Sequence, residues 1–159
     1  TTLVGQLALY ITMYSPLQMA ADLPENYKKF NDAFQFIKDV PCDWSQSIYL
    51  EAEPADYITV ARQDKNSNDW YIGGKCDENG HKSVLKLDFL DKDYVYDCTI
   101  YADAKDADYK NNPKAYKITH KKVKKGDILK LTMAPGGGFA VSLEARWNGE
   151  ERVERPTKM

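Results

Sequence analysis

The first residues of the chain follow a helical repeat of hydrophobic positions. Apolar side chains recur at intervals of three and four residues from Leu3 to Tyr14, which is the spacing of one face of an α-helix. We therefore predict a helix over residues 2–14. Ser15-Pro16 ends this helix, because a residue that precedes proline avoids the helical conformation.

A second apolar run covers residues 17–21 and is too short to decide its own conformation. Its composition suits a fully buried strand, although periodicity alone does not exclude a helix. Asp22 ends the run and, with Glu25 three residues later, forms a helix-capping pattern. A second helix is predicted over residues 24–38. The order helix, strand, helix is that of an α/β unit, which needs a larger partner to bury its faces.

From Ser47 onward the hydrophobic period changes from 3.6 to 2. Turn-forming pairs such as Asn79-Gly80 separate several short runs rich in β-branched and aromatic residues. This pattern predicts an antiparallel β-sandwich over residues 42–145, followed by a polar tail over residues 146–159. The predicted strands cover residues 57–62, 69–73, 82–87, 94–101, 115–123, 128–133 and 138–143.

Length and charge narrow the possible classes of protein. The chain has 159 residues, which is enough for one domain but not for a complete eight-stranded β/α barrel of about 250 residues. Its formal net charge of −2 gives no basic footprint for nucleic acid. Residues 1–21 carry no charge, yet Pro16 and several polar residues interrupt them, and no basic residue precedes them. We therefore expect no nucleic-acid partner, no membrane span and no signal peptide in this chain.

The cysteines and histidines do not form a recognisable metal motif. Cys42, Cys76 and Cys98 lack the C-x-x-C spacing, and their odd number does not fit a complete disulfide framework. His81 and His120 stand alone in the sequence. We predict buried thiols, and no metal ligands among these residues.

Two loops are candidate ligand sites. Asp103, Asp106 and Asp108 could supply oxygen ligands to calcium, but the loop lacks the glycine and distal glutamate of an EF-hand. A solvated loop is the favoured interpretation. The glycines at 136–138 precede a strand rather than a helix, so a tight turn is favoured over a phosphate loop.

The chain offers few candidate residues for catalysis or for sugar binding. Trp44, Trp70 and Trp147 could form a sugar-stacking platform, but core packing is the favoured interpretation. No Ser/His/Asp set or carboxylate pair stands out, so we predict no catalytic residue. Asp22 is the one candidate substrate-binding residue, because side chains at the carboxyl ends of barrel strands face the active site. A helix N-cap is the alternative role for Asp22, and the two roles are compatible.

Several segments of the chain resemble glycoside hydrolase family 97, and they occur in the same order as in that family. The segments cover residues 6–10, 14–27 and 36–41 with Trp44, and then residues 61–62, 69–73, 87–90 and 134–140. The resemblance extends from Thr1 to about Leu143. It implies that residues 1–41 are the end of a catalytic (β/α)8 barrel, a helix-strand-helix remnant, and that residues 42–145 are the C-terminal β-sandwich.

The resemblance also implies properties of a longer parent enzyme. Family members are calcium-dependent α-glucosidases or α-galactosidases that Bacteroides-type bacteria export to the periplasm. Their catalytic carboxylates and most calcium ligands would lie upstream of Thr1, so we expect this chain alone to hold no calcium and to be inactive. The chain would begin inside a larger protein. The α-linked oligosaccharide would bind the upstream barrel, while the sandwich braces that barrel or forms a homo-oligomer. A carbohydrate-binding or assembly module is the alternative.

Overall fold

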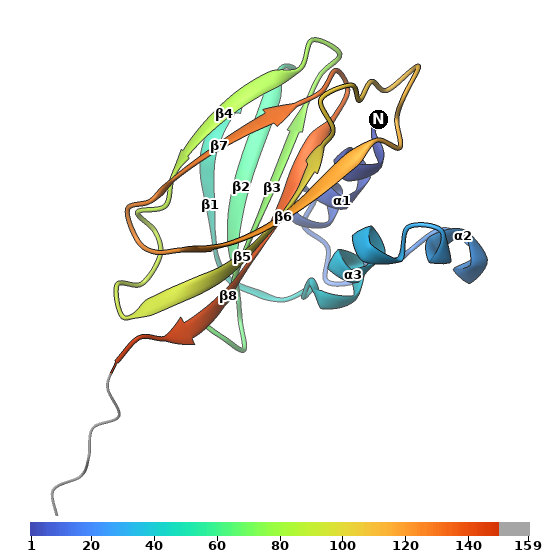
Figure 1. The fold of residues 1–159 in the computed structure, drawn as a ribbon. Coiled ribbons are helices and arrows are strands. Elements are labelled where there is room, and N and C mark those ends of the chain that lie inside the picture. Colours follow the sequence, from blue (N-terminus) through green and yellow to red (C-terminus); the bar gives the residue numbers. More distant parts are fainter. Residues whose placement is uncertain (150–159) are drawn as a thin grey trace, which may run out of the picture.

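The computed structural model describes residues 1–149, which form three helices followed by eight strands (Figure 1). The helices are α1 (Leu3–Thr12), α2 (Pro24–Lys28) and α3 (Asn31–Asp39). The strands are β1 (Trp44–Glu53), β2 (Tyr57–Asp64), β3 (Trp70–Cys76), β4 (His81–Lys86), β5 (Tyr94–Asp103), β6 (Tyr116–Val123), β7 (Ile128–Met133) and β8 (Gly138–Trp147).

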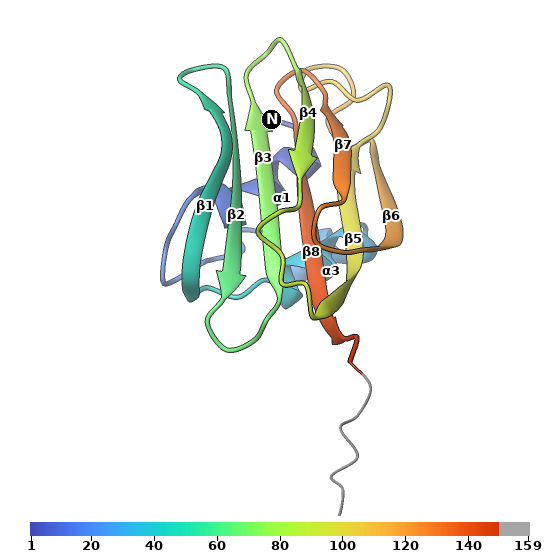
Figure 2. The same ribbon diagram turned by 90° about the vertical axis from the view of Figure 1, so that its left-hand side faces the viewer.

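The strands form two antiparallel sheets. Six strands make one sheet in the order β1-β2-β3-β8-β5-β6, and β4 pairs with β7 in a second sheet. Figure 2 shows the small sheet lying across the middle of the large one. The predicted antiparallel β-sandwich is therefore confirmed, and each of the seven predicted strands is present.

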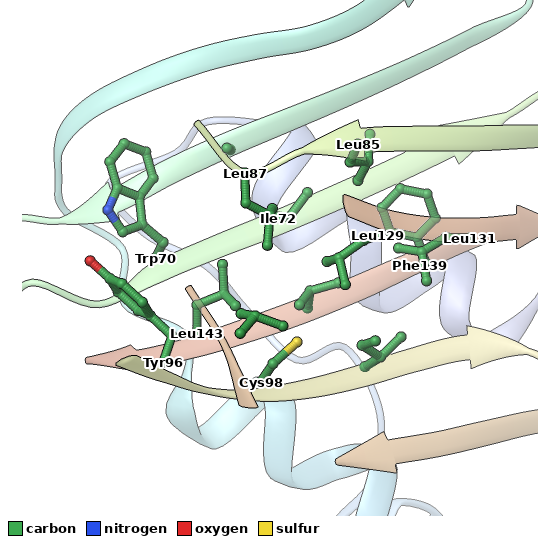
Figure 3. Close-up of a cluster of buried hydrophobic side chains, with 14 of the residues drawn as sticks. Trp70, Ile72, Leu85, Leu87, Tyr96, Cys98, Leu129, Leu131, Phe139 and Leu143 are labelled. Atoms are coloured by element: carbon green, nitrogen blue, oxygen red, sulfur yellow. The ribbon is translucent and has the colours of Figure 1, made fainter. Parts of the chain in front are cut away.

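The main core lies between the two sheets. Alternate side chains of each strand point into it, as the period-2 pattern requires. Trp70, Tyr96 and Phe139 are the largest of its fully buried members (Figure 3). The smaller sheet contributes Leu85, Leu129 and Met133 from the facing side. The turn at Asn79-Gly80, where Gly80 has a positive φ of 75°, lets β4 fold back over β3.

Helix α1 packs on the outer face of the large sheet, over β3 and β8. The helix lies close to the sheet because the residues at the contact are small: Ala8 of the helix lies over Gly73 and Gly138. A Cβ added to Gly73 would lie 2.8 Å from the Ala8 carbonyl oxygen, so β3 needs a glycine there. A second buried cluster joins the helices to the sheet through Val4, Leu7, Ile11, Phe36, Tyr71 and Tyr101. Residues 1–41 thus share a core with the β-sandwich.

Two predictions about secondary structure were wrong, and one strand was missed. Residues 17–21 form no strand, because no neighbouring backbone pairs with them in the described part of the chain. The helix over residues 24–38 is divided, because Phe30 leaves helical geometry (φ −131°, ψ 46°) and packs its ring on Tyr116. Strand β1 was not predicted at all.

The end of the sandwich also differs from the prediction. Strand β8 continues to Trp147, so the first residues assigned to the polar tail belong to the sheet. Arg146 contributes to this extension by donating from Nε to Asp97 Oδ2 on the neighbouring β5 at 3.0 Å. Residues 150–159 of the predicted tail lie outside the described residues.

Candidate functional site

The most exposed hydrophobic stretch of the described chain connects α1 to α2. We call residues 13–23 the apolar segment. Its large side chains are Met13, Tyr14, Leu17, Met19 and Leu23, and each is between 61% and 76% exposed. Scattered single apolar residues are normal on protein surfaces, but five on eleven consecutive residues form the kind of patch that marks an interaction site.

The apolar segment is folded by its own polar groups. The Ser15 hydroxyl donates to the Leu17 carbonyl at 2.7 Å, and the Gln18 amide donates to the Met13 carbonyl at 3.1 Å. The Tyr10 hydroxyl donates to the Met19 carbonyl at 3.4 Å, which ties the segment back to α1. Polar atoms are therefore satisfied locally, and the apolar side chains are the groups that face outward.

A cavity of about 860 Å³ opens between α1, the apolar segment and the α2–α3 pair. Its lining includes Leu7 and Tyr10 from α1, Met19 from the segment, and Phe30 and Phe34 from the second helical region. Burial raises the pKa of the Tyr10 hydroxyl, which also contributes to this lining. The cavity and the apolar segment together form one largely apolar surface on the helical side of the molecule.

Arg62 fixes the point where α1 ends and the apolar segment begins. Its guanidinium is 6% exposed on β2; Nε donates to the Ile11 carbonyl at 2.7 Å and Nη1 donates to the Ser47 hydroxyl at 2.6 Å. A cation at a helix C-terminus stabilises the partial negative charge of the last carbonyls. The same guanidinium carbon lies 5.9 Å from the centre of the Tyr14 ring.

The N-terminus of α1 packs against the glycine turn at residues 136–138. The Thr2 amide donates to the Gly136 carbonyl at 3.2 Å, and Lys75 Nζ donates to the same carbonyl at 3.2 Å. Beside it, Asp103 Oδ2 accepts the amides of Ala134 (2.9 Å) and Gly138 (2.8 Å). The glycines at 136–138 form a turn before β8, and this turn anchors the N-terminus of α1.

Asp22 lies at the rim of this surface and is exposed. Its Oδ1 accepts hydrogen bonds from Asn26 Nδ2 and from the Leu23 amide, both at 2.7 Å, and these lower the pKa of the carboxyl group. The N-cap of α2 is Leu23, so the capping role predicted for Asp22 is wrong by one residue. A substrate-binding role for Asp22 stays a prediction.

The three acidic residues at the end of β5 and in the β5–β6 loop do not converge. Asp103 turns inward to the amides described above, whereas Asp108 Oδ1 accepts the Lys110 and Asn111 amides and Asp106 accepts Asn112 Nδ2. Within residues 1–149 no group of three or more His, Cys, Asp or Glu side chains is placed to hold a metal ion. None of the helices in that part of the chain is long and apolar enough to cross a membrane.

The remaining candidates are dispersed over the sandwich. Trp70 is buried and Trp44 packs edge-on against Tyr71 at 5.8 Å, so neither shares an exposed face with Trp147. Cys42, Cys76 and Cys98 are free thiols. Burial raises the pKa of Cys98 to about 11, which makes it unreactive near neutral pH.

Sequence reasoning missed Arg62 and misjudged the apolar segment. Arg62 lies within a predicted strand as an ordinary charged residue, and only the position of α1 shows that it is buried. The uncharged composition of residues 1–21 is the signal that the sequence offers for the segment, and it predicts burial for all of these residues. In the structure the helical part is buried and residues 13–23 are mostly exposed.

Comparisons with known proteins agree with this fold. A family described as "Glycosyl-hydrolase 97 C-terminal, oligomerisation" matches residues 43–144. A retaining alpha-galactosidase of Bacteroides thetaiotaomicron is 34% identical over 139 residues, which are 87% of this chain and 20% of that protein. The chain therefore spans about a fifth of the length of that relative.

Solved structures give the same result. A glycoside hydrolase family 97 enzyme from Pseudoalteromonas sp. strain K8, in complexes with panose and with acarbose, is 46% identical. It superposes with a TM-score of 0.90 over 92% of this chain and 23% of that one. A beta-arabinopyranosidase is 26% identical with a TM-score of 0.71, over 89% of this chain and 21% of its own. This chain belongs to glycoside hydrolase family 97, and it forms the C-terminal domain of that family.

Proposed function

We propose that this chain is the C-terminal domain of an α-glycosidase and that its apolar segment and cavity pack against an upstream catalytic region. The observation that carries the proposal is the surface of residues 13–23, where large hydrophobic side chains lie next to an apolar cavity. The length of the relatives supports it, since about four fifths of each relative lies outside the part matched here.

The proposed reaction is hydrolysis of an α-linked oligosaccharide, either a glucoside or a galactoside. Such hydrolysis needs two carboxyl groups that flank the scissile bond and stabilise an oxocarbenium-like transition state. We place both carboxyl groups in the upstream region. One relative is named a retaining enzyme, and retention by the parent of this chain would require the two carboxyl groups to lie about 5–5.5 Å apart.

The described residues do not fit a calcium site. The carboxylates of Asp103, Asp106 and Asp108, at the end of β5 and in the loop after it, each accept separate backbone or side-chain amide donors and do not converge. We therefore place the calcium that the family resemblance implies in the upstream region, together with the substrate. Export to the periplasm is proposed on the resemblance alone.

The domain has a second proposed role, which is self-association of the enzyme. The family description includes oligomerisation. A domain that both braces the catalytic region and joins subunits needs two surfaces. In this proposal the apolar segment is the surface that contacts the catalytic region. Asp22, at the rim of the segment, would lie at that contact.

The test is hydrolysis of nitrophenyl α-galactoside and nitrophenyl α-glucoside, with and without calcium. The chain of 159 residues is compared with the same chain preceded by the coding sequence upstream of Thr1. We expect turnover only from the longer protein. Calcium-dependent release of nitrophenol by the 159-residue chain would refute the assignment of the catalytic groups to the upstream region.

A carbohydrate-binding module is the alternative from a different class. It would present several coplanar aromatic rings, but Trp70 is in the core and Trp44 packs on Tyr71. Titration with maltooligosaccharides distinguishes the two, because saturable quenching of tryptophan fluorescence that is lost in Trp147→Ala would favour the binding module.

A further inference from the structure

The large sheet ends in two free edges of different character. Strands β1 and β6 are its outermost strands, and each hydrogen-bonds to one neighbour among the described residues. Figure 2 shows them on opposite sides of the molecule. An edge strand leaves a row of backbone donors and acceptors unpaired, which is a template for pairing with another strand.

The β6 edge is protected by charge. Lys117, Lys121 and Lys122 lie on this eight-residue strand and are exposed. None of the three is paired with a carboxylate in residues 1–149, so their charges remain free to repel a second copy of the same edge. Lysine on an edge strand is a common device against edge-to-edge association.

The β1 edge lacks this protection. Its ten residues contain no lysine, arginine or proline. Two register shifts, between Trp44 and Gln46 and between Tyr49 and Glu51, bracket a regular stretch from Gln46 to Tyr49. That stretch is uncharged, and it ends in a tyrosine whose side chain is 64% exposed.

The acidic residue nearest this stretch is drawn inward. Glu51 Oε1 accepts the Thr59 hydroxyl at 2.9 Å and also the Ser83 hydroxyl, and Oε2 lies 3.3 Å from His81 Nε2. Ser83 and His81 belong to β4, so these contacts tie β1 to the opposite sheet. They hold the carboxylate between the two sheets, where it does not repel a strand that approaches the free edge.

We propose that the β1 edges of two copies of this chain pair antiparallel across a twofold axis, with residues 46–49 at the centre. This proposal rests on the self-association part of the proposed function and names its surface. The two six-stranded sheets would continue into each other. Four residues extend over only about 13 Å, so the backbone ladder is short and Tyr49 supplies apolar contact beside it. We expect a dimer with a dissociation constant on the order of micromolar.

The β1 edge is close to the apolar segment, but the two surfaces are separable. Arg62 connects them, because it bonds Ser47 on β1 and lies next to the Tyr14 ring. No backbone hydrogen bond joins residues 13–23 to β1 in the described structure. A substitution on one surface therefore leaves the other in place.

The test compares two substitutions in the 159-residue chain by light scattering coupled to gel filtration over a range of protein concentrations. Tyr49→Lys adds a charge to the free edge. Val84→Lys is the matched control, because Val84 is also 64% exposed but lies on β4, in the other sheet. We expect a concentration-dependent dimer for the wild type and for Val84→Lys, and a monomer for Tyr49→Lys. The melting temperature of Tyr49→Lys should equal that of the wild type when both are measured at protein concentrations below the dissociation constant of the dimer.

Hydrogen exchange locates the contact. Dimerisation should protect amides of residues 45–50 at least threefold more at high than at low protein concentration, and leave residues 117–122 unchanged. A dimer that survives Tyr49→Lys, or one that Leu17→Lys alone dissociates, would overturn the β1 edge as the surface while keeping self-association. A wild-type monomer at every concentration would overturn both.

Discussion

Gly73 should be intolerant of even one added methyl group, because α1 lies directly over it. A Cβ at this position would lie 2.6 Å from Ile11 Cβ and 2.8 Å from the Ala8 carbonyl oxygen. Carbon atoms in contact prefer separations of about 3.5–4.0 Å. In Gly73→Ala the whole helix must therefore move away from the sheet, because one of the obstructing atoms is backbone.

The size of the effect follows from two opposing contributions. Overpacking in a well-filled interior costs about 1–3 kcal/mol. Replacement of a strand glycine by alanine recovers about 0.5–1 kcal/mol of conformational free energy. The difference lies between about 0 and 2.5 kcal/mol, and we expect Gly73→Ala to lower the free energy of unfolding by about 1.25 kcal/mol, the middle of that range, which corresponds to a fall in melting temperature of about 2.5–5 °C for a chain of this size.

The assay is urea unfolding together with hydrogen exchange of the α1 amides. Gly5→Ala is the matched control: Gly5 is also buried, but the atoms nearest its added Cβ belong to the side chains of Thr1, Lys75 and the N-cap residue Thr2, and none of them is backbone. A helix gains about 1 kcal/mol from this change, so the control should be neutral or stabilised. Wild-type stability and undiminished α1 protection in Gly73→Ala would refute the close packing of helix on sheet.

Three further changes test other parts of the fold. Arg62→Met removes the donors to Ile11 and Ser47 and should cost about 1.5–3 kcal/mol in urea unfolding, while Arg62→Lys should recover only part of the loss. Phe36→Ala empties the core beneath α3 and should cost about 3–5 kcal/mol; a loss below about 1 kcal/mol would contradict its burial. Burial raises the pKa of Asp103; its stabilising contribution is therefore complete below the unfolded pKa of about 3.9 and is lost as pH rises through the folded pKa. The stability of the wild type relative to Asp103→Asn should fall as pH rises above about 3.9, and a flat or rising difference would contradict this.

Most of the sandwich could be predicted because its strands alternate cleanly. In β7 every second residue is buried, and the buried Leu129, Leu131 and Met133 alternate with Lys130 and Thr132 in the sequence. Burial alternates in β4 as well, but there Ser83 is buried and Val84 is exposed. Strand β1 could not be predicted in this way. It is an edge strand with two register shifts, and each shift changes which side chains face the core.

The predictions for the helical region were wrong for a different reason. Residues 17–21 have the composition of a buried strand, but a strand also needs a neighbour, and composition does not show whether one is present. Phe30 is apolar at a helical spacing, yet its contact with Tyr116 requires a break in the helix. Contacts between residues far apart in the sequence decided both cases.

The candidate site was only partly visible in the sequence. The lack of charge in residues 1–21 identified the right part of the chain. It did not separate the buried face of α1 from the exposed apolar segment that follows. The role of Arg62 depends on a carbonyl 51 residues away in sequence, so no local pattern could reveal it.

The central claim is that the apolar segment binds an upstream catalytic region, and calorimetric titration tests it most directly. The protein encoded upstream of Thr1 is titrated with the 159-residue chain, and with the same chain carrying Leu17→Lys and Met19→Lys, at two of its most exposed apolar positions. We predict saturable binding with a dissociation constant of about 1 μM or tighter for the wild type, weakened at least tenfold in the double variant. The absence of binding, or equal binding by the two chains, would contradict the claim.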